Sequence, residues 1–185
     1  MLNAAMEQKA TDGLNLRLSI ASNTAVPFLL FGLILGKAST DILTSTLWVL
    51  AGLAIYTLAE YFFHRVVLHE FATEGHRLHH VEPFAPHAMP FSAGLSVHTA
   101  MLVVLAISFG FELGLCIALG SSIGYALYCQ LHELIHRDPS LARRLVPRLY
   151  RHHMLHHRAD QTKGEENNFG VLTTMWDRVF GTYRA

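Results

Sequence analysis

Long uncharged stretches alternate with polar segments along this chain of 185 residues. Residues 18–36 contain no charged side chain across nineteen positions, and residues 42–59 contain none across eighteen. A third uncharged stretch is broken by prolines at its start, so its apolar helix is expected to begin near Ser92, and a fourth covers residues 113–132. A helix of roughly 20 apolar residues crosses the hydrocarbon core of a bilayer. The pattern therefore predicts an all-α protein with four transmembrane helices.

The four predicted helices form two hairpins, and a polar segment follows each hairpin. These segments, residues 60–82 and 133–185, hold eleven of the fourteen Lys and Arg residues. Cytoplasmic loops are enriched in Lys and Arg, so both segments and both chain termini are expected on the cytosolic side of the membrane. Residues 1–17 are interpreted as a polar N-terminal lead, and residues 18–185 as a single domain. The alternative for any one apolar stretch is a buried or re-entrant helix.

Composition supports an integral membrane protein and argues against other classes. Charged residues make up 15% of the chain and hydrophobic residues 51%, with a mean hydropathy of +0.30, whereas soluble domains contain about 25% charged residues. The net charge of zero argues against nucleic acid as a partner. Cys116 and Cys129 lie in apolar stretches without CxxC spacing, which favours packing over a disulfide. Three GxxxG spacings, which begin at Gly32, Gly110 and Gly120, favour close helix packing within the chain and leave a homodimer open.

Histidine is the unusual residue, because eleven of the thirteen fall within residues 64–80 and 132–157. Each window holds a spaced pair followed by a triplet with HxxHH spacing. The pairs are His64 with His69 and His132 with His136, and the triplets are His76, His79 and His80, and His153, His156 and His157. Positions i, i+3 and i+4 share a face of an α-helix, so each triplet is expected to point in one direction. The first pair is five residues apart and diverges by roughly 140° on a regular helix, so it needs a bent or ending helix.

These ten histidines indicate a metal centre. A tetrahedral zinc ion takes about four ligands, so ten imidazoles suit two metal ions with five or six ligands each. Imidazole binds iron, copper and zinc alike, so the ligand type does not identify the metal. A solvated run of histidines beside a membrane would explain one window, but it would not explain two windows with matching spacing.

The histidine boxes, together with NNFG at residues 167–170 and WDRVFGTY at residues 176–183, resemble the fatty acid hydroxylase and sterol desaturase superfamily of membrane-bound di-iron oxygenases. The resemblance covers residues 43–183. It implies a four-helix transmembrane stalk and a cytosolic histidine-rich helical cap with two iron ions, which zinc can replace in purified protein. It also implies hydroxylation or desaturation of a lipid, in the first place a fatty-acyl chain, with O2 and electrons from a separate donor. That donor would be cytochrome b5 or ferredoxin with its reductase, because the chain has no GxGxxG fingerprint. The implied metal ligands are His64, His69, His76, His79, His80, His132, His136, His153, His156 and His157.

The resemblance suggests weaker roles for four other residues. Asn168, Trp176 and Asp177 fall in the tail motifs, where a carboxylate that orients a ligand imidazole is the usual arrangement. Packing of the tail is an equal alternative for each of them. His152 is a substitute candidate for the histidine that follows it. The two histidines that match no box are His87 and His98, and the second is interpreted as a satisfied polar group in a membrane helix.

Other functions remain open from the sequence alone. HELIH at residues 132–136 matches the HExxH motif of zinc metalloproteases with Glu133 as the base, but that reading leaves eight histidines without a role. A carotenoid hydroxylase has a similar first window, but its third box is expected to be HxxxxH. A membrane metal transporter would need a chain of polar residues through its spans, which is lacking here. Only six residues separate His69 from His76, fewer than expected in sphingolipid hydroxylases, so the resemblance is not extended to their substrate.

Overall fold

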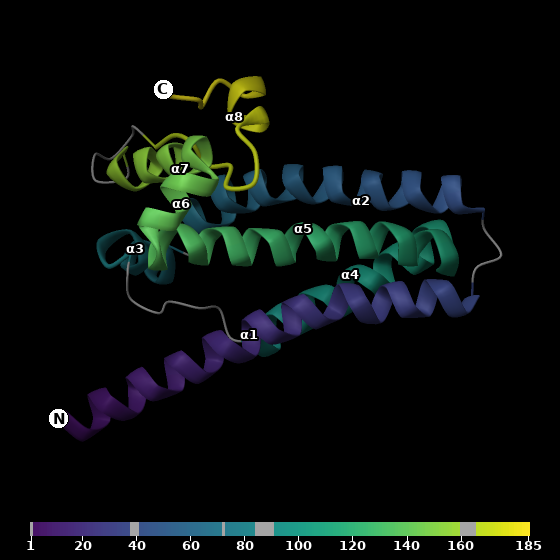
Figure 1. Ribbon diagram of the computed structural model, residues 1–185, viewed down its shortest axis with the longest axis horizontal. Helices are drawn as coiled ribbons and strands as arrows, with labels where there is room; N and C mark the ends of the chain where they lie inside the picture. The colour runs from purple at the N-terminus through teal and green to yellow at the C-terminus, as the bar shows by residue number, and fades with distance from the viewer. Residues whose placement is uncertain (1, 38–40, 72, 84–90, 160–165) are drawn as a thin grey trace. The chain divides into compact units, whose positions relative to one another are not determined.

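The structure of the chain, a computed structural model, is entirely helical in its regular elements. It describes residues 2–37, 41–71, 73–83, 91–159 and 166–185, and the side chains within residues 13–36, 41–71, 76–83, 94–158 and 166–185. The helices are α1 (Leu2–Lys37), α2 (Ile42–Phe62), the π-helix η1 (Phe63–Phe71), α3 (Thr73–Val81), α4 (Phe91–Phe109), α5 (Phe111–Arg137), α6 (Pro139–Leu145), α7 (Pro147–Ala159) and α8 (Met175–Val179) (Figure 1). The all-α prediction is confirmed for the part of the chain that the structure describes.

Three helical segments are long and apolar enough to cross a membrane. They are Gly13–Gly36 in α1, Ile42–Phe71 in α2 and η1, and Phe111–Arg137 in α5. Helix α4, Phe91–Phe109, is also apolar over its described part, Gly94–Phe109, and its role as the fourth transmembrane helix stays a prediction. Large hydrophobic side chains on α1, α2 and α4 are exposed, as expected for surfaces that contact acyl chains. The predicted polar lead covers residues 1–17, and residues 2–17 form the first part of α1.

The chain forms two compact units. Unit 1 comprises Met1–Tyr56 and Pro86–Ala126, and unit 2 comprises Thr57–Ala85 and Leu127–Ala185. Unit 1 therefore contains α1, α4, most of α2 and the first part of α5. Unit 2 contains η1, α3, α6, α7, α8 and the last turns of α2 and α5.

Glycines bring helices of unit 1 into close contact. A Cβ atom added to Gly120 on α5 would lie 1.9 Å from the backbone oxygen of Val49 on α2, and one added to Gly124 would lie 2.5 Å from the ring of Tyr56. This GxxxG spacing therefore packs within the unit, as predicted, whereas an added Cβ at Gly32 would meet no described atom within 4 Å. The apolar core beside these contacts consists of Leu30, Leu115, Ala118 and Leu119.

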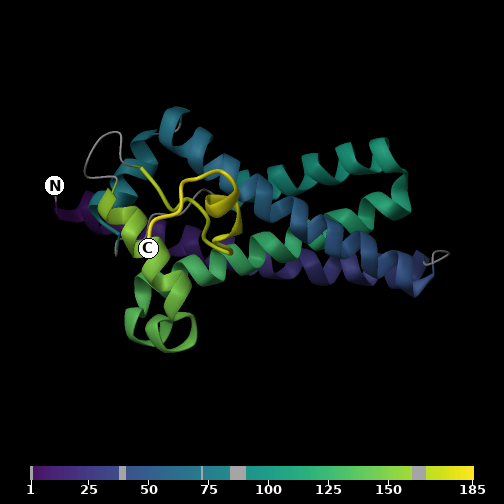
Figure 2. The same cartoon turned by 90° about the horizontal axis from the view of Figure 1, so that it is seen from above.

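In unit 2, α6 and α7 turn back on each other (Figure 2). Asp138 caps the start of α6, where its Oδ1 accepts a hydrogen bond from the backbone N–H of Leu141 at 3.0 Å, and Pro139 follows at the first helical position. The C-terminal segment, residues 166–185, lies beside α7 in both views. It contains α8 and forms polar contacts with His64, His152 and His156.

Candidate metal centre

The structure brings the ten predicted ligand histidines together in two groups of five, both inside unit 2. In each group, one ring nitrogen from every histidine lies within 4.8 Å of the others. Group A consists of His64, His69, His76, His80 and His156, and group B consists of His79, His132, His136, His153 and His157.

A π-helix places the first spaced pair in one group. His64 and His69 lie in η1, Phe63–Phe71, and their ring centroids are 5.3 Å apart. A π-helix joins residue i to residue i+5, so residues five apart come to lie one above the other. The irregular helix that the spacing required is therefore present. The second pair, His132 and His136, needs no such distortion because four residues make about one α-helical turn, and its ring centroids are 4.6 Å apart.

Each HxxHH triplet is divided between the two groups. On α3 the first and last members join group A and the middle member joins group B, whereas on α7 the assignment is reversed. The three rings of each triplet lie with centroids within 6.0 Å of one another, as expected for one side of a helix, but they serve two groups, because adjacent positions on an α-helix diverge by about 100°. Each group thus takes its own spaced pair, two members of its own triplet and one member of the other. The groups are neighbours: the rings of His80 and His157 stack with centroids 4.3 Å apart.

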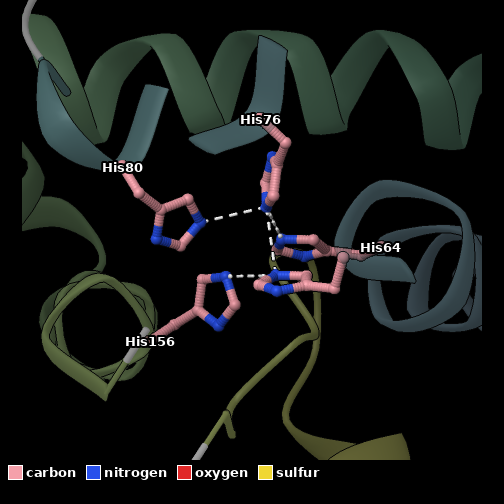
Figure 3. Close-up of side chains that lie close together, drawn as sticks. His64, His76, His80 and His156 are labelled. Atoms are coloured by element: carbon pink, nitrogen blue, oxygen red, sulfur yellow. Dashed lines mark hydrogen bonds between the residues drawn. The ribbon is translucent and has the colours of Figure 1, made fainter. Parts of the chain in front are cut away.

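In group A, ring nitrogens from η1, α3 and α7 converge on one region. Figure 3 shows His64, His76, His80 and His156 with their imidazole nitrogens turned toward one another. The Nε2 atom of His76 lies 3.0 Å from Nε2 of His64, 3.0 Å from Nε2 of His80 and 3.1 Å from Nε2 of His69. Nε2 of His156 lies 3.3 Å from Nε2 of His69.

The spacing of the nitrogens fits metal ions with more than four ligands. In group B, Nε2 of His153 lies 2.9 Å from Nε2 of His136 and 3.1 Å from Nε2 of His157. Two nitrogens bound at a right angle, each about 2.1 Å from a metal, would lie about 3.0 Å apart, and two at the tetrahedral angle about 3.4 Å apart. Five of the six distances given for the two groups lie close to the right-angle value, which is typical of five or six ligands.

Burial keeps these imidazoles neutral. Burial, followed by the neighbouring rings of His64 and His69, lowers the pKa of His80 to about 3. Burial and adjacent imidazoles also lower the pKa below its ordinary value in His76, His153, His156 and His157. A neutral imidazole offers a nitrogen lone pair, so at neutral pH these residues are in the state that binds a cation. The donor set therefore fits two metal ions.

Backbone carbonyls of the C-terminal segment orient two rings of group A. The Nδ1–H of His64 donates to the carbonyl of Phe169 at 2.5 Å, and the Nδ1–H of His156 donates to the carbonyl of Asn167 at 2.7 Å. Because a carbonyl can only accept, each ring carries its proton on Nδ1 and directs an unprotonated Nε2 into the group. Such a partner fixes the tautomer and raises the basicity of a ligand imidazole.

The Nδ1 atoms of group B have different neighbours from those of group A. The Nδ1 atoms of His136, His153 and His157 are buried and have no hydrogen-bond partner among the residues that the structure describes. His132 stacks on Tyr128 with ring centroids 5.6 Å apart and an interplanar angle of 18°. Helix position and ring packing therefore orient these imidazoles.

Asp177 and His152 pair with each other outside both groups. Nε2 of His152 lies 3.0 Å from Oδ2 of the fully buried Asp177, and the His152 ring stacks on Tyr183 with centroids 5.5 Å apart. His153, rather than His152, is the member of group B. Asp177 is linked to group A through the backbone of Phe169, whose N–H donates to Asp177 Oδ1 at 2.8 Å and whose carbonyl contacts His64.

The other two tail residues, Asn168 and Trp176, contact the end of the chain and α2, respectively. Asn168 has a φ of 58°, in the left-handed region that asparagine tolerates, and its Oδ1 accepts from the N–H of Arg184 at 2.8 Å. The indole N–H of Trp176 donates to Oγ1 of Thr57 at 3.1 Å. These contacts are with the end of the chain and with α2.

His98 and the HELIH residues lie in different units of the chain. His98 lies in unit 1, outside both groups, with Nδ1–H donating to the carbonyl of Gly94 at 2.9 Å. His87 lies outside the described residues. Within HELIH, both histidines join group B, while Glu133 forms an ion pair with Arg137 one turn further along α5.

Sequence reasoning missed Glu60. This residue is buried, and its Oε1 accepts a hydrogen bond from the backbone N–H of Val171 at 2.6 Å. One signal could have found it, since Glu60 is the first charged residue after the uncharged residues 42–59. The backbone carbonyls of Asn167 and Phe169 carried no signal beyond their place in the NNFG motif.

Comparisons with known proteins agree on one family. The family model described as fatty acid hydroxylase matches residues 49–182. The chain is similar to fatty acid 2-hydroxylase of Rattus norvegicus, with 29% identity over 145 residues that cover 71% of this chain and 38% of the relative. It is also similar to dihydroceramide fatty acyl 2-hydroxylase of Arabidopsis thaliana, with 30% identity over 149 residues that cover 72% of this chain and 59% of the relative.

A solved structure, described as full-length scs7p with only the hydroxylase domain visible, shares the fold. It matches 90% of this chain and 66% of its own chain with a TM-score of 0.72 and 23% sequence identity. The ceramide very long chain fatty acid hydroxylase of Saccharomyces cerevisiae is 28% identical over 152 residues, which cover 71% of this chain and 36% of the relative. The chain thus spans less than two thirds of the length of the curated relatives that it matches.

Proposed function

We propose that this chain, which belongs to the fatty acid hydroxylase family, uses O2 to hydroxylate a membrane lipid at a centre of two metal ions. The observation that carries the proposal is the pair of adjacent five-histidine groups. A metal centre in an integral membrane protein lies close to the acyl chains of the bilayer. Three helical segments of this chain are long and apolar enough to cross a bilayer. We further propose that α4 is the fourth transmembrane helix, that residues 18–185 act as one hydroxylase domain, and that the histidines and both termini face the cytosol.

Iron is the metal that we propose, with one ion in each histidine group. Imidazole ligands suit iron, and the nitrogen spacing favours five or six ligands over the four of a structural zinc ion. The chemistry supplied by two bound iron ions is the reduction of O2 with two electrons and two protons, which converts a C–H bond to C–O–H and releases water. Removal of a second hydrogen instead would leave an alkene and a second water.

The protein's own residues would bind the metal ions, orient the ligand imidazoles and exclude bulk water. The neutral imidazoles provide the ligands, and the carbonyls of Asn167 and Phe169 hold His156 and His64 with their Nε2 atoms directed inward. The buried setting excludes bulk water from the oxidising centre. A separate protein, cytochrome b5 or ferredoxin with its reductase, would supply the electrons.

A fatty-acyl chain or a related lipid chain is the substrate class that we propose. The relatives are named for fatty acid, ceramide and dihydroceramide hydroxylation, which favours acyl chains over carotenoids. These relatives include ceramide and dihydroceramide hydroxylases. The short interval between His69 and His76 had argued against a sphingolipid substrate. That interval contains the end of η1 and the start of α3. The acyl chain, rather than a particular headgroup, is therefore the part of the substrate that the proposal names.

The experiment is a metal count combined with a lipid oxygenation assay on protein in mild detergent. We expect two metal ions per chain by elemental mass spectrometry and O2-dependent hydroxylation of an acyl lipid by the iron-loaded protein with an added electron donor. One zinc ion per chain, with no oxygenation, would contradict the proposal.

Glu133→Gln separates the hydroxylase from the metalloprotease. In the proposed enzyme Glu133 only pairs with the partly exposed Arg137, and exposed ion pairs contribute little, so both metals and oxygenation should persist. If Glu133 were the base of a HExxH protease, the same substitution would abolish peptide hydrolysis. Loss of oxygenation with both metals retained would also contradict the role assigned here.

A further inference from the structure

Two buried acidic side chains accept hydrogen bonds from three consecutive backbone N–H groups of the C-terminal segment. The N–H of Phe169 donates to Oδ1 of Asp177 at 2.8 Å, and the N–H of Gly170 donates to Oδ2 of Asp177 at 2.9 Å. The next N–H, from Val171, donates to Oε1 of Glu60 at 2.6 Å. Each of these five residues is buried. The segment is therefore fixed along its N–H groups by hydrogen bonds to two buried side chains, and the two to the anionic Asp177 are stronger than hydrogen bonds between neutral groups.

Carbonyls of the same segment contact group A. Phe169, whose N–H is held by Asp177, presents its carbonyl to Nδ1 of His64, and Asn167 presents its carbonyl to Nδ1 of His156. The carboxylates and the two imidazoles thus lie on a continuous path of hydrogen bonds through one short stretch of backbone. A shift of this stretch would move both carbonyls and turn both rings.

Asp177 is itself held firmly. Each carboxylate oxygen accepts two hydrogen bonds, since Oδ1 also accepts from Oγ1 of Thr182 at 2.8 Å and Oδ2 also accepts from Nε2 of His152 at 3.0 Å. Burial would raise the pKa of Asp177, but hydrogen bonds from His152, Gly170 and Thr182 together lower it. The backbone carbonyl of Asp177 accepts from the N–H groups of Thr182 and Tyr183. An anionic Asp177 therefore joins the segment to the end of the chain.

We propose that Asp177 and Glu60 are positioning residues that set the metal affinity of group A through the carbonyls of Asn167 and Phe169, and that the affinity of group B does not depend on them. The proposal rests on the two-metal centre proposed above. No corresponding carbonyl contacts the buried Nδ1 atoms of His136, His153 and His157 within the described residues. Loss of an outer partner typically lowers metal affinity by 10–100-fold, so the effect is expected at one metal and not at the other.

The test uses the full chain loaded with zinc in detergent and titrated with a chelator. Each carboxylate oxygen of Asp177 accepts two hydrogen bonds. In Asp177→Asn, an amide N–H₂ replaces one of these oxygens and cannot accept them. We expect one zinc ion per chain to be released at a chelator activity about 10–100-fold lower than in the wild type, and the other to be released as before. Asp138→Asn is the matched control, because it makes the same change at an exposed helix cap; both metals should be retained.

Single-metal backgrounds assign the weakened metal. His157→Ala removes a ligand of group B and His156→Ala removes a ligand of group A. Adding Asp177→Asn should weaken the remaining zinc in His157→Ala and leave it unchanged in His156→Ala. The opposite pattern, or equal weakening in both backgrounds, would overturn the proposal.

Glu60 provides a second set of variants if Asp177→Asn does not fold. Glu60→Gln keeps an acceptor oxygen for the N–H of Val171, whereas Glu60→Leu keeps bulk but removes the acceptor. We expect Glu60→Leu to weaken one zinc ion by about tenfold and Glu60→Gln to weaken it much less. Equal effects of the two variants, or loss of both metals together, would overturn the positioning role. A wild-type chain that binds fewer than two metals would instead refute the underlying two-metal centre.

Discussion

Group A and group B contain five imidazoles each, yet they are oriented by different parts of the protein. In group A, backbone carbonyls of the C-terminal segment hold His64 and His156 at Nδ1. In group B, His136, His153 and His157 have no hydrogen-bond partner at Nδ1 among the described residues, and the rings are placed by α5, α7 and mutual packing. Two sites with matching ligand spacing can therefore depend on different structural supports.

We expect this difference to separate the two proposed metals functionally. A metal in group A would depend on the docking of residues 166–185, whereas a metal in group B would depend on the helices that carry its ligands. The two are still joined, because each triplet contributes histidines to both groups. Damage to α3 or α7 should therefore affect both metals, and damage to the C-terminal segment should affect chiefly group A.

Alanine substitutions at two adjacent histidines of α7 should give the largest effects. His156 belongs to group A and His157 to group B, so His156→Ala and His157→Ala should each lower the metal content from two to one per chain. Turnover should fall by more than about 100-fold in both, because loss of an outer partner alone costs 10–100-fold. Elemental mass spectrometry and product analysis check this. Loss of both metals from either variant would show that the groups do not bind independently.

Acid should destabilise the metal-free chain, and both groups should contribute. Burial and neighbouring imidazoles lower the pKa of His80 in group A to about 3, and also lower the pKa of His157 in group B. An unfolded histidine titrates near 6.5, so below that pH the unfolded chain binds protons that the folded chain excludes. The contribution of these histidines to the free energy of unfolding is therefore fully present above pH 6.5 and is lost as the pH falls toward 3. We expect Tm to drop by more than about 5 °C between pH 7.5 and pH 5. A Tm that rises on acidification would contradict the lowered pKa values, and His80→Asn should flatten the profile.

Local spacing made the helices and the ten histidines predictable, because the 3.6-residue period places i, i+3 and i+4 on one side of a helix. The same period could not decide which group each triplet member joins. That choice depends on the position of the neighbouring helix, and His79 and His80 consequently join different groups. The need for an irregular helix at His64 and His69 was predictable, but the π-helix itself was not. Glu60 was not identified because its partner is a backbone N–H group, which no residue pattern specifies.

Neighbouring His152 and His153 offer a smaller and sharper comparison. His153 lies in group B, and His152 pairs with Asp177 beneath the segment that supports group A. His153→Asn should release the metal of group B. His152→Asn should keep both metals, weaken that of group A by at most about tenfold, and lower the stability by about 1.5–3 kcal/mol, the range for a hydrogen bond to a charged group. Chelator titration and thermal unfolding distinguish the two. Equal metal loss from both variants would mean that His152 acts as a ligand.

Trp176→Phe should have the smallest effect and should show how far the support of group A extends. Trp176 precedes Asp177, yet its indole N–H donates to Oγ1 of Thr57 on α2 at 3.1 Å. A neutral hydrogen bond contributes about 0.5–1.5 kcal/mol, so Tm should fall by about 2–4 °C with both metals retained. Thr57→Val should produce a similar change, and the double variant should be less destabilised than the sum because the two side chains share one interaction. If Trp176→Phe instead released the metal of group A, the anchoring of α8 to α2 would belong to the same support as Asp177. Group A would then depend on the whole C-terminal segment rather than on its carboxylate contacts alone.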